Sequence, residues 1–279
     1  MAFSILNNIA GINAQNQLNI NSANLNKTLL RLSSGKRINS AADDAAGLGI
    51  ADSLRANVRA LDQAARNAND GISVAQIGDG ALQQISDLLM RGFSLAEQAA
   101  TDTVDADGRA ALNAELTSIK NEIDRLATQV NYNGVKLFTA EGLNGELNVF
   151  VGDTASISSI SVIFPTITTT SVGGTDLSGT SLATQAGAEA AITSLTGALA
   201  GIAAARADLG AGMNRLQSSV AVLRNMSENT QAAESAIRDA NMAEEIANLT
   251  KYQILAQSGI AALAQANASS QLVLALLQK

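Results

Sequence analysis

Hydrophobic residues recur at helical spacing at both ends of the chain. Near the start, five positions form one stripe with 4-3-4-3 spacing: Leu18, Ser22, Leu25, Leu29 and Leu32. Near the end, ten positions keep alternating 3-4 spacing: Ile246, Leu249, Gln253, Ala256, Ile260, Leu263, Asn267, Ser270, Leu274 and Leu277. This spacing predicts coiled-coil seams, soft ones because polar residues interrupt them. Short isolated helices are marginal in water, so each end needs the other end or another subunit.

A much longer helix is expected between these ends. Apolar residues resume at helical spacing at Ile50 and continue, less regularly, through Leu95. They predict a helix over residues 44–100, roughly 85 Å long at 1.5 Å per residue. We expect Asn39 and Ser40 to cap this helix, with Asp43 and Asp44 in its first turn.

The rest of the chain adds helices and a small amount of β structure. Helical spacing returns over residues 112–126 and again from about 186 to 237, and residues 131–134 (NYNG) indicate a turn. Apolar alternation over 135–151 predicts hairpin strands, and the Ser, Thr and Gly of 154–185 predict a strand-and-loop insert or a flexible surface segment. The expected fold class is mainly α: a long antiparallel helical bundle or coiled coil with a small β-hairpin insert.

Composition excludes most catalytic chemistry. The 279 residues are 47% hydrophobic but only 3% aromatic, with no His, Cys or Trp and one Pro. Without His or Cys there is no Ser/His/Asp triad, no thiolate chemistry and no ordinary zinc, haem or iron–sulfur site. We therefore predict a protein that is not an enzyme, with no cofactor and no metal. No apolar run of about 18 residues is present, so no membrane span is expected.

Charge is unevenly distributed around the net value of −7. Residues 1–60 carry six basic and three acidic side chains, whereas residues 61–135 carry five and eleven. The basic start is too dilute for a nucleic-acid patch, so no nucleic-acid partner is expected. Two interpretations remain open: a solvated surface, or an electrostatic match between the start of one subunit and the middle of another.

Three short motifs have structural explanations that compete with functional ones. Adjacent residues on a helix do not face the same way, so Asp43–Asp44 favours capping over a catalytic carboxylate pair. Gly47–Gly49 follows no strand, which favours close helix packing over dinucleotide binding. The run over 103–108 resembles half a calcium loop, but Thr103 and Ala114 stand where an EF-hand needs Asp and Glu. The Ser- and Thr-rich insert suits either O-linked sugars or plain polar surface.

Several separate blocks of sequence resemble one family. Residues 33–51 (SSGKRINSAADDAAGLGIA) are similar to the N-terminal signature of bacterial flagellins, and residues 131–137 (NYNGVKL) resemble a turn of that family. Residues 225–245 resemble its second signature, and residues 262–278 (ALAQANASSQLVLALLQ) its final helix. The blocks occur in the family's order and cover the chain outside its insert.

The resemblance implies a structural subunit that self-assembles into the bacterial flagellar filament for swimming. It implies an inner-tube coiled coil from residues 1–43 and 236–279. It implies an outer-tube helical rod from 44–138 and 186–235, with a short variable insert at 139–185. We expect the polymer core to be built from the terminal seams, at Leu25, Leu29, Leu32, Ile260, Leu263, Leu274 and Leu277.

The resemblance also implies partners and a location. The subunit would be secreted through the flagellar type III apparatus without a cleaved signal peptide and would be extracellular. Its partners would be other flagellin subunits, the flagellar cap and hook-junction proteins, and an export chaperone. Toll-like receptor 5 would be a further partner, with contacts at Arg91, Leu95 and Glu115. Gly92, Phe93 and Ser94 depart from the charged stretch usual in strongly recognised members.

Two other functions remain open at this point. A hook–filament junction protein of the same superfamily shares the terminal helices. A cell-surface flagellin homologue could instead act as an extracellular binding module. The number of copies per cell separates the first from a filament subunit, and a direct binding assay on the monomer tests the second.

Overall fold

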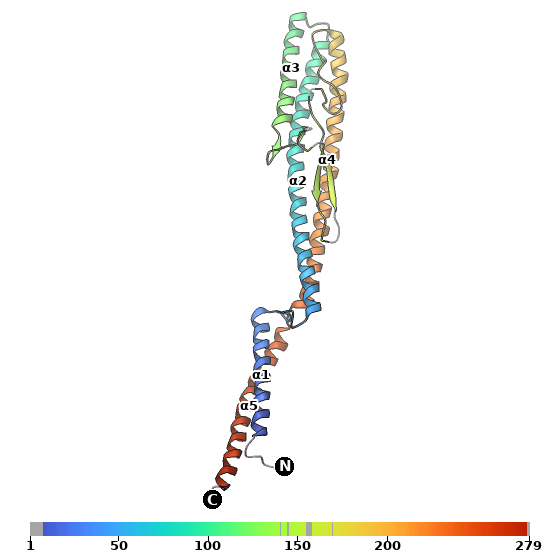
Figure 1. Cartoon of the computed structure of the whole chain (residues 1–279). Helices are drawn as coiled ribbons and strands as arrows, with labels where there is room; N and C mark the ends of the chain where they lie inside the picture. The colour runs from blue at the N-terminus through green and yellow to red at the C-terminus, as the bar shows by residue number, and fades with distance from the viewer. Residues whose placement is uncertain (1–7, 140, 144, 155–157, 169, 278–279) are drawn as a thin grey trace. The chain divides into compact units, whose positions relative to one another are not determined.

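The computed structural model describes residues 8–139, 141–143, 145–154, 158–168 and 170–277, without the side chains of 270–277 (Figure 1). Its elements are α1 (Ile9–Ser34), α2 (Ala45–Ala100), α3 (Ala106–Gln129), β1 (Asn131–Tyr132), β2 (Val135–Lys136), β3 (Glu146–Phe150), β4 (Ser159–Ile163), α4 (Gln185–Arg238) and α5 (Met242–Leu277). The expected fold class, mainly helical with a small β insert, is confirmed.

The chain forms two compact units, each described here by itself. Unit 1 comprises residues 1–56 and 229–279, and unit 2 comprises residues 57–228. Unit 2 therefore includes the whole segment 139–185 that the sequence set apart as an insert. The unit boundaries also fall inside α2 and α4, whereas the sequence placed them near residues 43 and 235.

Unit 1 pairs α1 with α5 in antiparallel orientation. A β-bridge joins Lys36 to Asp239 at one end of the pair. At the other end, Asn8 caps α1 by accepting from the Gly11 N–H at 2.9 Å, and its amide donates to the Ala266 carbonyl at 3.3 Å. Gly35 ends α1 in the left-handed region at φ 69°, where glycine is unstrained.

The start of α2 differs from the sequence expectation. The carboxylate of Asp44 accepts from the Gly47 N–H at 2.8 Å, so Asp44 caps the helix. Asp43 instead holds the preceding turn by accepting from the backbone N–H groups of Asn39 and Ser40. The prediction that Asn39 and Ser40 cap α2 was therefore wrong, because the turn places Asp44, several residues later, at the helix terminus.

Unit 2 is a bundle of α2, α3 and α4 around one continuous apolar core (Figure 1). Leu82, Ile85 and Leu89 of α2 and Leu116 of α3 lie in this core with Leu195 of α4. The other large buried contributors of the three helices include Leu61, Val74, Leu95, Ile119, Ile123, Ile202, Leu209 and Leu216. Leu, Ile, Val and Ala fill most of this core, which agrees with the low aromatic content.

Two hairpins lie within unit 2. The first pairs β1 with β2 across the predicted turn, where Asn133 (φ 51°) and Gly134 (φ 82°) adopt the positive φ angles of a tight two-residue turn. The second pairs β3 with β4 in antiparallel register, with Leu147 opposite Val162. The strands β2 and β3 confirm the hairpin strands predicted over residues 135–151.

The segment 139–185 packs into the core of unit 2. Phe164, Ile167, Val172 and Leu177 are at most 1% exposed. For residues 154–185 the sequence left open a strand-and-loop insert or a flexible surface segment, and the burial of these four residues matches the first. Sequence alone could not reveal this packing, because the surfaces that receive it lie on α2 and α4.

Glycines on the helices accommodate the second hairpin. A Cβ built at Gly71 would lie 2.6 Å from Val149, and one built at Gly212 would lie 2.9 Å from Val162. Real Cβ contacts are longer than this, so a side chain at either glycine would push the hairpin away. These helix glycines therefore let the hairpin approach closely.

By length and composition alone, α4 is the one helix of the described residues that could cross a membrane. Its apolar positions Leu195, Ile202, Leu209 and Leu216 are buried in the core of unit 2.

Candidate assembly surfaces

The inner seam of unit 1, where α1 faces α5, mixes leucines with small and polar residues. From α1 it contains buried Gly11, Asn21 and Thr28 and half-buried Leu18, Leu25 and Leu32. From α5 it contains buried Glu245 and half-buried Leu249, Tyr252, Ala256, Gly259, Leu263 and Ala266. Leu18 packs over Gly259, where a Cβ would lie 3.3 Å from the leucine methyl.

This inner seam differs from the predicted stripe at alternate positions. Leu18, Leu25 and Leu32 face inward as expected, but Asn21 and Thr28 lie between them in place of Ser22 and Leu29. On α5, Gly259 and Ala266 replace Ile260 and Asn267 in the same way. Residues one position apart can each complete a heptad stripe, and at Thr28, Gly259 and Ala266 the inward residue is the smaller of the two.

Other large aliphatic side chains of unit 1 are exposed, on more than one side of the helix pair. We call this set the outer apolar face: Ile9, Ile12, Ile20, Leu29 and Leu30 of α1, and Met242, Ile246, Ile254, Leu255 and Ile260 of α5. Leu29 is 53% exposed and Ile260 58% exposed. Two further residues predicted for the polymer core, Leu274 and Leu277, belong to the part of α5 whose side chains the structure does not describe. Exposed apolar surface of this kind marks an interaction site.

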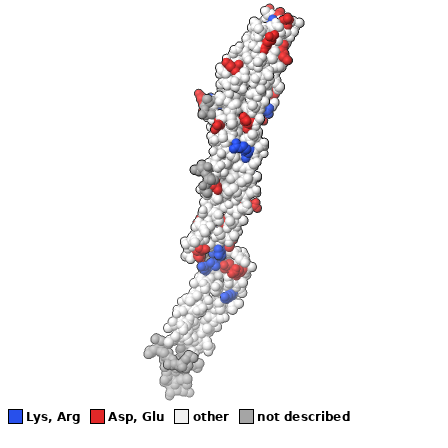
Figure 2. All heavy atoms as spheres, turned by 90° about the vertical axis from the view of Figure 1, so that its right-hand side faces the viewer, with Lys and Arg blue, Asp and Glu red and all other residues white. Residues whose placement is uncertain are grey.

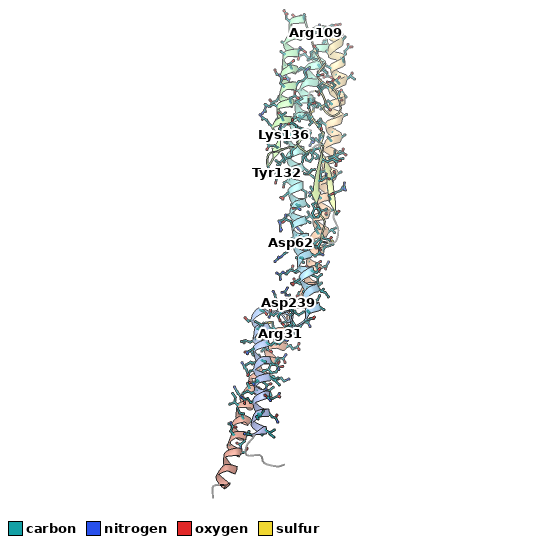
Figure 3. The ribbon with its side chains drawn as sticks, viewed as in Figure 1. Arg31, Asp62, Arg109, Tyr132, Lys136 and Asp239 are labelled. Atoms are coloured by element: carbon teal, nitrogen blue, oxygen red, sulfur yellow. The ribbon has the colours of Figure 1, made fainter. Side chains whose placement is uncertain are left out.

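An ion pair crosses the inner seam. Nη1 of Arg31, which is labelled in Figure 3, lies 3.3 Å from Oε1 of Glu245. The Glu245 side chain is only 9% exposed. Arg31 Nε and Glu245 Oε2 are buried and have no hydrogen-bond partner among the described residues. The Arg31 side chain is 26% exposed, and the loss of hydration offsets much of the attraction within such a partly buried pair.

A second ion pair fixes the turn before α2. The Lys27 ammonium, 2.7 Å from Oδ1 of Asp43, holds the pKa of that carboxyl well below its usual range. The backbone N–H groups of Ser40 and Asn39 lower the pKa further. The Asp43–Asp44 motif therefore has two structural roles, one carboxylate in the turn and one at the helix cap.

The three residues proposed for receptor contact occupy different environments in unit 2. Arg91 of α2 donates from Nε and Nη2 to Oε1 of Glu115 on α3, at 2.9 and 2.7 Å. Their side chains are 58% and 44% exposed. Leu95, one turn after Arg91, is only 2% exposed and packs in the core. The surface at this point therefore presents the ion pair, and the leucine supports it from beneath.

The remaining motifs have structural roles. Asp105 caps α3 by accepting from the Gly108 N–H at 2.8 Å, which accounts for the run that resembles a calcium loop. Gly47 packs against Ile38, and a Cβ there would lie 2.9 Å from that side chain. Within the part of the chain that the structure describes, no three His, Cys, Asp or Glu side chains gather as a metal site. Figure 2 shows charged groups as scattered spots on a largely uncharged face.

These features define a class of protein: a helical structural subunit whose terminal helix pair exposes its large apolar residues. Comparison with protein families agrees. The model of the bacterial flagellin N-terminal helical region matches residues 5–142, and that of the C-terminal helical region matches residues 192–277. The chain belongs to the bacterial flagellin family, which is a family of structural proteins.

Curated relatives match over nearly the full length. The chain is 37% identical to "Flagellin FlaB1" of Treponema pallidum (strain Nichols), covering 98% of this chain and 99% of that protein. It is also 37% identical to the "Flagellar filament 30.7 kDa core protein" of Treponema maltophilum, with the same coverage. The resemblance inferred from the sequence is confirmed.

Solved structures share the fold. A putative flagellar hook-associated protein from Vibrio parahaemolyticus aligns with a TM-score of 0.57 and 14% identity, covering 71% of this chain and all of that one. At this identity the likeness shows the fold alone, and it does not favour the hook–filament junction alternative.

Proposed function

We propose that this chain self-assembles into the flagellar filament and that the outer apolar face of unit 1 is its main polymerising surface. One observation carries the proposal: the terminal helix pair exposes many large aliphatic side chains, while the leucines of its inner seam are only half-buried among small and polar residues. A lone pair built in this way leaves most of its aliphatic surface in water. Packing copies side by side removes that surface from water, which is favourable at about 25 cal/mol per Å².

The predicted core residues have two roles in this proposal. Leu25, Leu32 and Leu263 are half-buried in the inner seam and join α1 to α5 within one copy. Leu29 and Ile260 lie on the outer apolar face and contact neighbouring copies. Leu274 and Leu277 are proposed for the polymer core from their spacing in the sequence alone.

A soft inner seam suits a subunit that orders on assembly. Gly11, Asn21, Thr28 and Gly259 bury little apolar area between the helices. Contacts with neighbouring copies then offset the conformational entropy that the helix pair loses when it becomes ordered. The chain is proposed to leave the cell through the type III apparatus with an export chaperone, without a cleaved signal, and to add beside cap and hook-junction proteins.

The experiment compares polymerisation of outer-face variants. Ile260 is 58% exposed, and full burial of an isoleucine side chain contributes about 1.5–3 kcal/mol, so its remaining share is roughly 1–1.7 kcal/mol. Ile260→Ser should therefore raise the critical concentration about 5- to 20-fold. Gln257→Ser, an exposed polar position on the same helix, is the matched control.

Electron microscopy and sedimentation read out the result. The native chain should form long uniform filaments, and a chain ending at residue 246 should form none. Filaments of Ile260→Ser at the native critical concentration would contradict the outer-face assignment. Equal polymerisation by the truncated chain would overturn the role of the terminal helices.

The exposed Arg91–Glu115 pair supports a second proposal, contact with Toll-like receptor 5. The two charged side chains present a fixed hydrogen-bonding surface from two helices of unit 2. Receptor signalling by Arg91→Ala and Glu115→Ala, compared with Arg125→Ala on the exposed part of α3, tests this proposal.

A further inference from the structure

An apolar cavity of about 390 Å³ opens on unit 2 between α2 and the two hairpins. Its walls include Val74, Leu137 and Leu147. Around them stand exposed apolar side chains: Tyr132 is 38%, Val135 45% and Phe150 44% exposed. A cavity of this size and composition is the usual form of a binding site.

One acidic group lies at this cavity. Asp70 of α2 contributes to its lining, is exposed and has no ion-pair or hydrogen-bond partner among the described residues. The neighbouring polar lining residues, Asn67, Asn133 and Asn148, are uncharged. The cavity therefore favours an apolar group that carries a positive charge beside it.

A ridge on α4 has this chemistry. Val222 and Met226 are 55% and 41% exposed, and their spacing of four places them on one face of the helix. Arg215, seven residues before Val222, lies on the same stripe, is exposed and has no partner among the described residues. Met90 of α2 is also exposed and apolar, but Asp87 lies three positions before it. If Met90 entered the cavity, the Asp87 carboxylate would approach that of Asp70, and the two like charges would repel.

We propose that Val222 and Met226 of one copy insert into the cavity of a second copy, with Arg215 facing Asp70. This inference rests on the proposed filament function and adds a contact between copies of unit 2. The cavity and the ridge are different surfaces of the same unit, so the contact is heterologous and leaves both surfaces available for the next copy. It therefore propagates instead of closing into a dimer.

Disulfide trapping tests the contact directly, because the native chain contains no cysteine. The variant Tyr132→Cys with Met226→Cys should form a ladder of cross-linked chains when polymers are oxidised, and none at monomer concentrations. Tyr132→Cys with Arg224→Cys is the matched control, since residue 224 is exposed on the other side of α4.

A charge-exchange cycle tests the polar part. Asp70→Arg and Arg215→Asp should each raise the critical concentration about three- to tenfold, and the double exchange should return it to within about twofold of the native value. Arg224→Asp makes the same charge change off the ridge and should leave the critical concentration within about twofold. All three positions are exposed, and circular dichroism of each monomer verifies its fold.

The outcomes separate this contact from the filament proposal. Native filaments without the 132–226 ladder, or with an equal ladder in the control, overturn the contact and leave the filament function standing. Thiol labelling of Tyr132→Cys at the same rate in polymer and monomer also overturns it, because the cavity is then open or takes another partner. If the native chain fails to polymerise, both proposals fall.

Discussion

Replacing one buried glycine of α2 tests whether the segment 139–185 is part of the core of unit 2. Gly78 lies beneath the ring of Phe164, and a Cβ at this position would be 2.6 Å from Cε1. The ring has little freedom to move: it is 1% exposed, its centroid is 6.2 Å from that of Phe138, and the Phe164 N–H is bonded to the Gly145 carbonyl at 2.9 Å. Gly78→Ala therefore forces a displacement.

Two opposing effects set the size of the result. Alanine is favoured over glycine inside a helix by about 1 kcal/mol. Overpacking a dense core costs typically about 1–3 kcal/mol. The expected net effect of Gly78→Ala is thus a loss of up to about 2 kcal/mol in the free energy of unfolding. Gly80→Ala is the matched control, since nothing lies within 4 Å of its built Cβ. That variant should gain up to about 1 kcal/mol.

Urea unfolding of the full chain, followed by circular dichroism below the polymerising concentration, measures both changes. A double-mutant cycle makes the test specific, because Phe164→Leu removes the ring that the new methyl meets. The pair Gly78→Ala with Phe164→Leu should be about 1–2 kcal/mol less destabilised than the sum of the single variants. Equal effects at Gly78 and Gly80, or additivity within about 0.5 kcal/mol, would refute the packing of this segment on α2.

Three further outcomes follow from charged groups. Lys27 lowers the pKa of Asp43 in the folded state, so the stabilisation from this carboxylate is present above its unfolded pKa of about 3.9. That stabilisation is lost as the pH falls through the folded-state pKa. Titration of Asp43 followed by NMR should show the lowered pKa, and Lys27→Met should raise it. Arg91→Ala or Glu115→Ala should change the free energy of unfolding by less than about 1 kcal/mol, since the pair is exposed; a larger loss by urea unfolding would contradict this. If the basic residues 1–60 of one subunit attract the acidic residues 61–135 of another, polymers should dissociate as the salt concentration rises, since exposed charges are screened over about 8–10 Å. Turbidity that does not change with salt would contradict this attraction between subunits.

The sequence predicted the helices well because their signals are local. The apolar period and the NYNG turn each depend on neighbouring residues, and the structure has a helix or turn where each was predicted. The cap of α2 shows the limit of this reasoning. Asn39, Ser40, Asp43 and Asp44 are all good capping residues, so only the path of the turn decides that Asp44 is the one at the terminus.

The packing partners could not be predicted, because they are not local. After Leu18, the stripe that faces α5 can run through residues 22 and 29 or through residues 21 and 28. Hydrophobicity alone favours the first, because it includes Leu29. The structure takes Asn21 and Thr28 instead, and on α5 it takes Ala266 and Gly259, the latter beneath Leu18. The exposure of Leu29 and Ile260 is the consequence, and no sequence pattern alone distinguishes it from a buried seam.

The two assembly surfaces lie in separate compact units, which gives their energies a simple relation. The outer apolar face belongs to unit 1 and the cavity and ridge to unit 2, and they share no residue. Effects at sites without shared partners add within about 0.5 kcal/mol. Ile260→Ser combined with Val222→Ala should therefore raise the critical concentration by the product of the single effects. If the combined effect is no larger than that of Ile260→Ser alone, the two surfaces do not contribute independently. In that case α4 either does not contact neighbouring copies, or contacts them only after the terminal helices have joined the copies.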